Sequence, residues 1–243
     1  MIKPSLQSIF FLIGAFACFQ AGAQQSPAVS GDEEVEPGYL IVTGWYKDTA
    51  VSKAYVEKVA PVIRKYGFVT AKIGMPGKNL NVLEGSWVPR GFSFMQFSSE
   101  KAVKQFWTST DYQMNVKPIR EGQSALDVLK VGAAFGTKPT MDAHSALLVF
   151  LVDISDREKL MDQYVPKAPK IVARYGGKFL VSSAQWATEL LEGDHPSESI
   201  VVVEFPSADA LRAFWNDEEY KVLSEIRKST GKWSVIEILP FTL

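Results

Sequence analysis

The chain carries one sequence pattern twice, and this repeat constrains its fold more than any other feature. The pattern reads Tyr-Gly, Leu-Glu-Gly, Phe-x-Ser, Phe-Trp, Tyr and Ile-Arg. In the first copy it occupies Tyr66-Gly67, Leu83-Glu84-Gly85, Phe97-x-Ser99, Phe106-Trp107, Tyr112 and Ile119-Arg120, and in the second copy Tyr175-Gly176, Leu191-Glu192-Gly193, Phe205-x-Ser207, Phe214-Trp215, Tyr220 and Ile226-Arg227. Two copies of roughly a hundred residues each indicate a duplicated domain rather than a solenoid.

The N-terminus has the pattern of an export signal. Lys3 precedes an apolar run at 9–19, and Ala21-Gly22-Ala23 supplies the small residues of a cleavage site. The run is shorter than the roughly 20 residues that span a bilayer. We therefore expect cleavage near Ala23 (signal peptide 1–23) and a secreted or periplasmic mature chain. An uncleaved anchor and lipidation at Cys18 are the alternatives.

The composition restricts the partners of the mature chain. Cleavage would remove Cys18, the only cysteine, so neither a disulfide nor thiol chemistry is expected. The formal net charge of the whole chain is −1 and no basic stripe is present, so neither nucleic acid nor, after signal cleavage, a membrane is expected as a partner. Residues 24–37 are rich in Ser, Pro, Gly and acidic residues, which indicates a flexible tether.

Each copy shows the same order of predicted elements, β-α-β-β-α-β, which is a ferredoxin-like unit. In the first domain, 38–136, we expect strands at 39–45, 69–73, 92–97 and 125–131, and helices at 55–66, 99–107 and 111–121. Residues 74–85 connect the second and third strands. Pro61 should kink or split the first helix.

The second domain, 146–243, follows a linker at 137–145 and repeats this order. Strands are expected at 147–152, 179–182, 200–205 and 233–239, with helices at 160–175 and 207–215. Pro166 and Pro169 should interrupt the first of these helices, and Ser207 is a credible N-cap of the second. Helices cover one face of each sheet, so the other face must be buried elsewhere. We expect an α+β fold in which the two tandem domains pair sheet to sheet as an intramolecular dimeric α+β barrel.

The second copy resembles a known family of small domains. The motifs that carry the resemblance are Arg174-Tyr175-Gly176-Gly177, Leu191-Glu192-Gly193, Val201-Val202-Val203-Glu204-Phe205-Pro206-Ser207, Phe214-Trp215 and Glu219-Tyr220. They are similar to domain of unknown function (DUF) 1330, in the dimeric α+β barrel superfamily. The first copy is a degraded version, with Lys65-Tyr66-Gly67-Phe68 lacking the second glycine. The resemblance implies the fold and no activity; cofactor-free monooxygenases, lactone isomerases and haem-degrading enzymes of the wider superfamily are analogies only.

Glu204 is the candidate for acid–base chemistry. Strand alternation places Ile200, Val202 and Glu204 on one face, and we expect that face to point into the barrel. A buried carboxylate there could act as general acid or base. The alternative is a structural role, in which Glu204 pairs with an arginine and holds the fold. Its counterpart in the first copy, Gln96, is a candidate ligand-binding residue that cannot exchange protons usefully.

Matched arginines and aromatic residues are the other candidate ligand-binding groups. Arg120 and Arg227 could hold a substrate carboxylate or enolate, or be helix-end arginines tied to Glu192, Glu204 or a backbone carbonyl. Tyr112 and Tyr220 are candidates because their hydroxyls need partners. The repeated tryptophans at 107 and 215 are expected to be core.

Several chemistries are not expected. His144 and His195 are the only histidines, neither lies on a predicted helix, and their spacing suggests neither a metal site nor haem ligation. The chain lacks a Gly-x-Gly-x-x-Gly turn, a phosphate loop and a Gly-x-Ser-x-Gly elbow. We therefore predict no cofactor.

The main functional hypothesis is an exported protein that binds a small, partly apolar molecule in or beside the barrel. An alternative is a cofactor-independent oxygenase or isomerase acting on a quinone- or lactone-like substrate, which predicts an unpaired Glu204 in a cavity faced by Arg227 or Tyr220. A purely structural role predicts a barrel interior filled by side chains.

Overall fold

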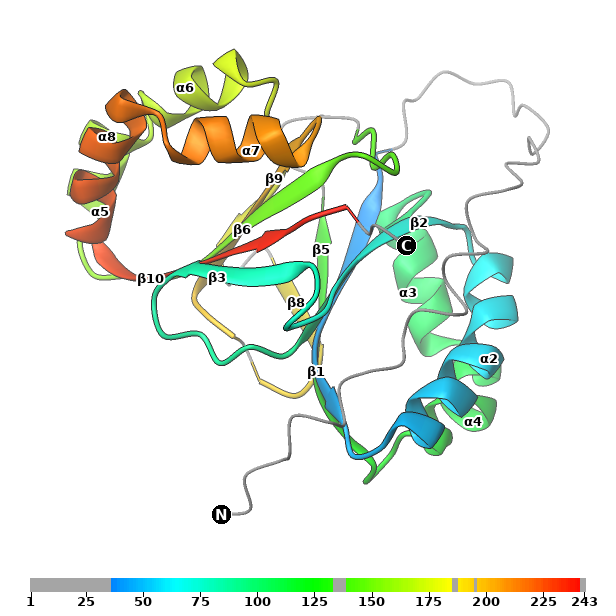
Figure 1. Cartoon of the computed structure of the whole chain (residues 1–243). Helices are drawn as coiled ribbons and strands as arrows, with labels where there is room; N and C mark the ends of the chain where they lie inside the picture. The colour runs from blue at the N-terminus through cyan, green and yellow to red at the C-terminus, as the bar shows by residue number, and fades with distance from the viewer. Residues whose placement is uncertain (1–35, 133–138, 185–187, 195, 241–243) are drawn as a thin grey trace.

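The protein contains two antiparallel five-stranded sheets (Figure 1). The computed structural model describes residues 36–132, 139–184, 188–194 and 196–240. The first sheet has the order β2 (Phe68–Gly74), β4 (Gly91–Phe97), β1 (Gly38–Tyr46), β5 (Ser124–Gly132) and β8 (Thr188–Glu192), and the second has the order β3 (Leu80–Glu84), β10 (Gly231–Ile238), β6 (Ala146–Ile154), β9 (Ser199–Phe205) and β7 (Lys178–Ala184). The expected signal peptide, Cys18, most of the tether and His195 lie outside the described residues.

The two halves of the chain, 36–132 and 139–240, exchange one strand each. Strand β3 belongs to the first half but pairs with β10 of the second. Strand β8 belongs to the second half but pairs with β5 of the first. The sequence pattern predicts no strand in either segment, so the expected β-α-β-β-α-β order lacks one strand per half. Each of these strands has only five residues, and its partner is far away in sequence.

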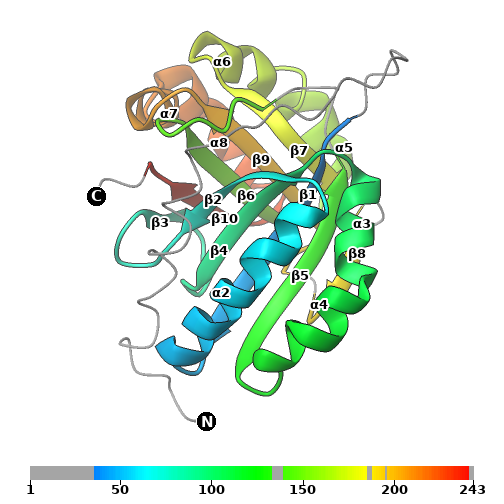
Figure 2. The same cartoon turned by 90° about the vertical axis from the view of Figure 1, so that its right-hand side faces the viewer.

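Helices cover the outer face of each sheet (Figures 1 and 2). The first sheet carries α2 (Thr49–Lys65), α3 (Glu100–Thr108), α4 (Thr110–Asn115) and the 3₁₀ turn η3 (Lys117–Ile119); the second carries α5 (Arg157–Lys159), the π-helical turn η4 (Leu160–Tyr164), α6 (Ala168–Arg174), α7 (Ala208–Trp215) and α8 (Glu218–Lys228). Ser207 caps α7 through the Ala210 backbone N–H, as predicted. None of the helices in the described residues is long and apolar enough to cross a membrane.

Proline acts differently on the first helix of each half. Helix α2 continues through Pro61, so of the two predicted outcomes, a kink or a split, the split is wrong. Pro61 is exposed, and water can satisfy the carbonyl that loses its helical partner. In the second half the chain breaks into α5, η4 and α6, with Pro166 in the connection and Pro169 at the start of α6. The predicted interruption there is confirmed.

The inner faces of the two sheets pack against each other, as the predicted sheet-to-sheet pairing requires. Buried side chains from both halves form this core, including Tyr39 stacked on Phe94 with ring centroids 4.7 Å apart. Val202 of β9 points into it, whereas Val203 points toward the helices of its own half. The predicted alternation of β9 is therefore confirmed, and side chains fill the barrel interior.

Candidate functional site

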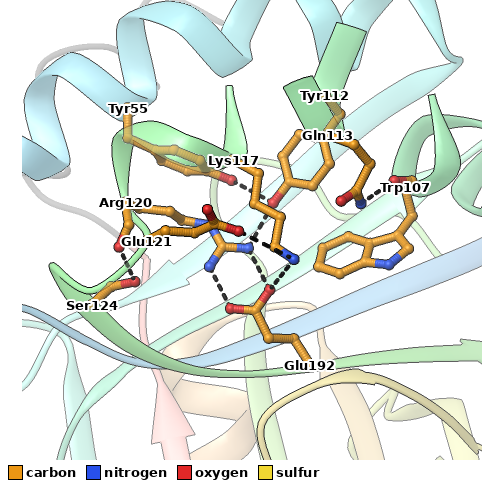
Figure 3. A network of polar contacts seen from close by, with 9 residues as sticks. All are labelled: Tyr55, Trp107, Tyr112, Gln113, Lys117, Arg120, Glu121, Ser124 and Glu192. Carbon is orange, nitrogen blue, oxygen red and sulfur yellow. Dashed lines mark hydrogen bonds and ion pairs between the residues drawn. The ribbon is translucent and has the colours of Figure 1, made fainter. Parts of the chain in front are cut away.

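Two buried arginines join the halves through the exchanged strands. Arg120 follows η3 and donates from Nη1 and Nη2 to the carboxylate of Glu192 in β8, at 2.5 and 2.9 Å (Figure 3). Arg227 in α8 donates in the same way to Glu84 in β3, at 2.9 and 2.7 Å. The guanidinium-bearing side chains are 1% and 0% exposed. Each bidentate pair therefore connects the helical layer of one half to the strand that the other half contributes.

The first arginine belongs to a closed polar cluster. The hydroxyl of Tyr112 accepts a hydrogen bond from Arg120 Nη2 at 2.8 Å and lies 3.2 Å from the hydroxyl of Tyr55 (Figure 3). Lys117 Nζ lies 3.6 Å from the carboxylate of Glu192. Burial would raise the pKa of Glu192, but the hydrogen bond and charge of Arg120 hold it below its usual value.

The second cluster has the same residue types but remains incomplete. The ring of Tyr220 packs on Phe214 with centroids 4.2 Å apart, and the residue is 1% exposed. Its hydroxyl forms no hydrogen bond of normal geometry within the described part of the chain, although Tyr164 and Arg227 both lie close to it. Burial raises the pKa of Tyr220, while the nearby Arg227 and Tyr164 act in the opposite direction. The contrast with Tyr112 shows that the duplicated clusters have diverged.

A cavity of about 660 Å³ lies between the outer face of the second sheet and the broken helix above it. Its walls are aromatic and aliphatic, with few polar groups. The main contributors are Phe150, Val152, Leu160, Tyr164, Val172, Phe179, Val201, Val203, Phe214 and Trp233. Met161 and Val165, which also border it, are 50% and 38% exposed. The cavity therefore opens to solvent along an apolar rim.

The equivalent space in the first half holds only about 90 Å³. There the unbroken α2 covers the sheet, and the cavity is lined by Tyr46 and Tyr55, whose rings lie 5.9 Å apart, together with Tyr112 and Arg120. Tyr46 ends β1 opposite the first residue of β5, and Ile154 occupies the matching position at the end of β6. A continuous helix and a larger side chain thus close the first half.

Glu204 lies on the other side of its sheet from this cavity. Its carboxylate accepts hydrogen bonds from the backbone N–H groups of Thr140, at 2.8 Å, and Met141, and the residue is 2% exposed. Gln96 occupies the related inner face of the first sheet, opposite Tyr39, and is half-buried. The structure therefore brings Tyr112 with Arg120 and Tyr220 near Arg227 beneath the helices, and places Gln96 and Glu204 apart from both clusters.

Replacing Glu204 with Gln should destabilise the protein by about 1–3 kcal/mol, because an amide leaves a buried N–H donor facing another donor. Urea unfolding followed by circular dichroism measures this loss. Glu198→Gln is the control, since Glu198 is exposed and accepts one backbone hydrogen bond, from Ile154. Equal stability of the two variants would show that the Glu204 carboxylate does not hold the segment around Met141.

The described residues include no group of three or more His, Cys, Asp and Glu side chains that could hold a metal ion. The backbone N–H of His144 donates to Asp142 in a turn before β6.

Sequence reasoning missed Glu84, Tyr55, Tyr164 and Trp233 as parts of the clusters. The repeated Leu-Glu-Gly motif was the available signal for Glu84, because it places a carboxylate at the same position in both copies.

Comparisons with known proteins identify the family. The family model described as "Domain of unknown function (DUF1330)" matches residues 37–134 and again 145–239. No curated protein matches the chain in sequence. The chain resembles the crystal structure of a protein provisionally named a monooxygenase from Lactobacillus acidophilus NCFM, with 10% identity, a TM-score of 0.49, and 84% of this chain and 93% of that one covered.

Two further solved structures are similar over most of the chain. An anthrone oxidase-like protein shares 12% identity with a TM-score of 0.47, over 88% of this chain and 94% of its own. A mutant chlorite dismutase from Candidatus Nitrospira defluvii shares 12% identity with a TM-score of 0.44, over 84% and 91%. At such identities the likeness concerns the fold and carries no chemistry. The two matches of the family model cover both halves, and the chain belongs to the DUF1330 family.

Proposed function

We propose that the protein binds a small, partly apolar molecule in the cavity between the second sheet and α5, η4 and α6. The observation that carries the proposal is the contrast between the halves: about 660 Å³ of apolar space in the second and about 90 Å³ in the first. The larger volume lies within the range of pockets that hold small molecules, which is about 300–1,000 Å³. The sequence left open whether the molecule binds in the barrel or beside it, and the barrel interior is filled by side chains.

Binding is favoured over acid–base catalysis by the position of Glu204. The oxygenase or isomerase alternative needed this carboxylate unpaired and facing a ligand cavity. Glu204 instead accepts two backbone hydrogen bonds on the inner face of β9, whereas the cavity lies on the outer face.

We also propose that the chain acts after export, as a secreted or periplasmic protein. Mass spectrometry of the secreted chain tests this, because cleavage near Ala23 would remove the mass of residues 1–23.

The cavity can be tested with a neutral apolar probe, N-phenyl-1-naphthylamine, whose fluorescence rises in apolar surroundings. Val201→Trp should weaken its binding at least tenfold, because an indole at the centre of the outer face of β9 fills the space that the probe needs. Val222→Trp is the matched control, since Val222 is 72% exposed on α8. Equal affinity for both variants would contradict the proposed site.

Native mass spectrometry of the protein purified from its source would then identify a retained ligand. A molecule bound to the wild type and to Val222→Trp, and missing from Val201→Trp, would support the proposal. A molecule retained by all three would place binding elsewhere. Circular dichroism confirms in each case that the variant is folded.

A further inference from the structure

We propose that the ligand of this cavity is an amphiphilic acid whose anionic head lies at the Arg157 end and whose apolar body lies against Phe179 and Phe214. The inference rests on the proposed function and adds the chemical class and orientation of the ligand. A carboxylic acid with an aliphatic or aromatic body has the required chemistry.

The cavity changes from polar to apolar along the strands. Near its polar end, Val152 of β6 pairs with Ser199 of β9 and with Trp233 of β10. One residue pair further along, Val201 lies between Phe150 and Ser182. At the far end Val203 pairs with Phe179, and Phe214 also lines the wall. The polar side chains that contribute from the outer face of the sheet thus lie toward the end of β6, where α5 begins.

Arg157 stands at this polar end as an unpaired cation. It is the first residue of α5, it borders the cavity, and it is exposed. It forms no ion pair with another described residue. The neighbouring carboxylates each accept a backbone hydrogen bond and do not border the cavity: Asp156 accepts from Lys159, Asp153 from Glu198, and Glu198 from Ile154. Glu158 is exposed and does not border the cavity.

Among the residues that the structure describes, the charged ones that border the cavity are both cations, Arg157 and Lys178. Lys178 is the strand partner of Glu204, which faces the barrel interior, and the next residue, Phe179, packs toward the helices. The side chain of Lys178 therefore points from β7 toward the barrel interior, away from the cavity. Arg157 remains as the charge available to a ligand in the cavity.

Two hydroxyl groups complete the polar end. Ser182 and Ser199 are strand neighbours of Val201 and Val152 on the cavity side, and their hydroxyls make no hydrogen bond to another described residue. Guanidinium groups bind carboxylates through two parallel hydrogen bonds, and hydroxyls add donors to the same oxygens. An anionic head at this end matches the guanidinium and the two hydroxyls, and an apolar tail matches the aromatic wall.

The test compares two fluorescent probes with nearly the same aromatic body. 1-Anilinonaphthalene-8-sulfonate carries an anionic head, and N-phenyl-1-naphthylamine lacks it. Arg157→Gln in the mature chain should weaken binding of the anionic probe by up to about fivefold, the upper end of the range for an exposed charge pair, and leave the neutral probe unchanged. Increasing salt should weaken only the anionic probe.

Lys159→Gln is the matched control, because Lys159 lies on the same short helix and does not border the cavity. The inference is overturned if both substitutions weaken the anionic probe equally, if Arg157→Gln weakens both probes equally, or if it affects neither. Failure of the proposed function has a different signature, since neither probe would then respond to Val201→Trp. A normal response of the neutral probe to Val201→Trp, with no effect of Arg157→Gln, would reject only the acidic head.

Discussion

Glu84→Gln is expected to lower the free energy of unfolding by about 3–5 kcal/mol, the usual cost of removing one partner of a buried ion pair. The substitution leaves the guanidinium of Arg227, which is 0% exposed, without its carboxylate. The neighbouring Phe150 and Trp233 rings, with centroids 5.6 and 4.9 Å from the guanidinium carbon, cannot replace that charge. Urea unfolding of the mature chain, followed by circular dichroism, gives the difference directly.

The duplicated pair supplies the control for this experiment. Glu192→Gln should cost less, about 1–3 kcal/mol, because Arg120 keeps its hydrogen bond to Tyr112 and the side chain of Glu192 is more exposed than that of Glu84, 27% against 19%. Replacing both Glu84 and Arg227 with Leu should recover much of the loss, since no buried charge then remains unpaired. If Glu84→Gln unfolds like the wild type, this ion pair does not hold the exchanged strand.

The first pair also gives a pH dependence with a defined sign. The pKa of Glu192 is lowered in the folded protein, so the unfolded chain binds this proton more tightly. The stabilisation is therefore complete above the unfolded pKa of the carboxyl group and is lost as the pH falls through the lower folded value. Glu192→Gln should remove this part of the acid sensitivity, so its difference from the wild type should shrink in acid.

The fold class could be predicted from the sequence because the repeat and the strand alternation can be read directly from the order of residues. Val202 and Glu204 alternate with Val203 as expected, and the proline-rich segment around Pro166 breaks the helix as expected. The strand exchange could not be predicted, because the sequence of a five-residue segment such as 80–84 does not specify which distant strand it pairs with. Whether the cavity lies in the barrel or beside it could not be decided from the sequence for a related reason. Its volume depends on how far a broken helix stands from the sheet, and no residue pattern encodes that distance.

Gly85→Ala is expected to destabilise the protein by about 2–5 kcal/mol, the combined range for a left-handed residue with a side chain and for an overpacked contact. Gly85 has a φ of +87°, and a Cβ there would lie 2.2 Å from the backbone oxygen of Trp233 and 2.7 Å from Oγ of Ser234. Because the oxygen is part of the β10 backbone, the clash cannot be relieved by a side-chain rotation. Thermal and urea unfolding both measure the loss.

Gly122→Ala separates the two causes. Gly122 has a φ of +66°, but a Cβ there would meet nothing within 4 Å, so only the backbone cost of about 1–2 kcal/mol applies. Gly193 repeats the situation of Gly85, since its φ is +78° and its Cβ would lie 2.4 Å from the backbone oxygen of Leu126. Gly85→Ala and Gly193→Ala should therefore both exceed Gly122→Ala.

The contacts of the glutamate and the glycine account for the presence of Leu-Glu-Gly in both halves. The glutamate reaches an arginine of the other half, and the glycine lets the exchanged strand end tightly against a neighbouring strand. The glutamate and the glycine of the motif thus serve the contact between halves rather than a ligand. Equal destabilisation by all three alanine substitutions would show that the close approach at Gly85 and Gly193 contributes nothing, and the motif would then need another explanation.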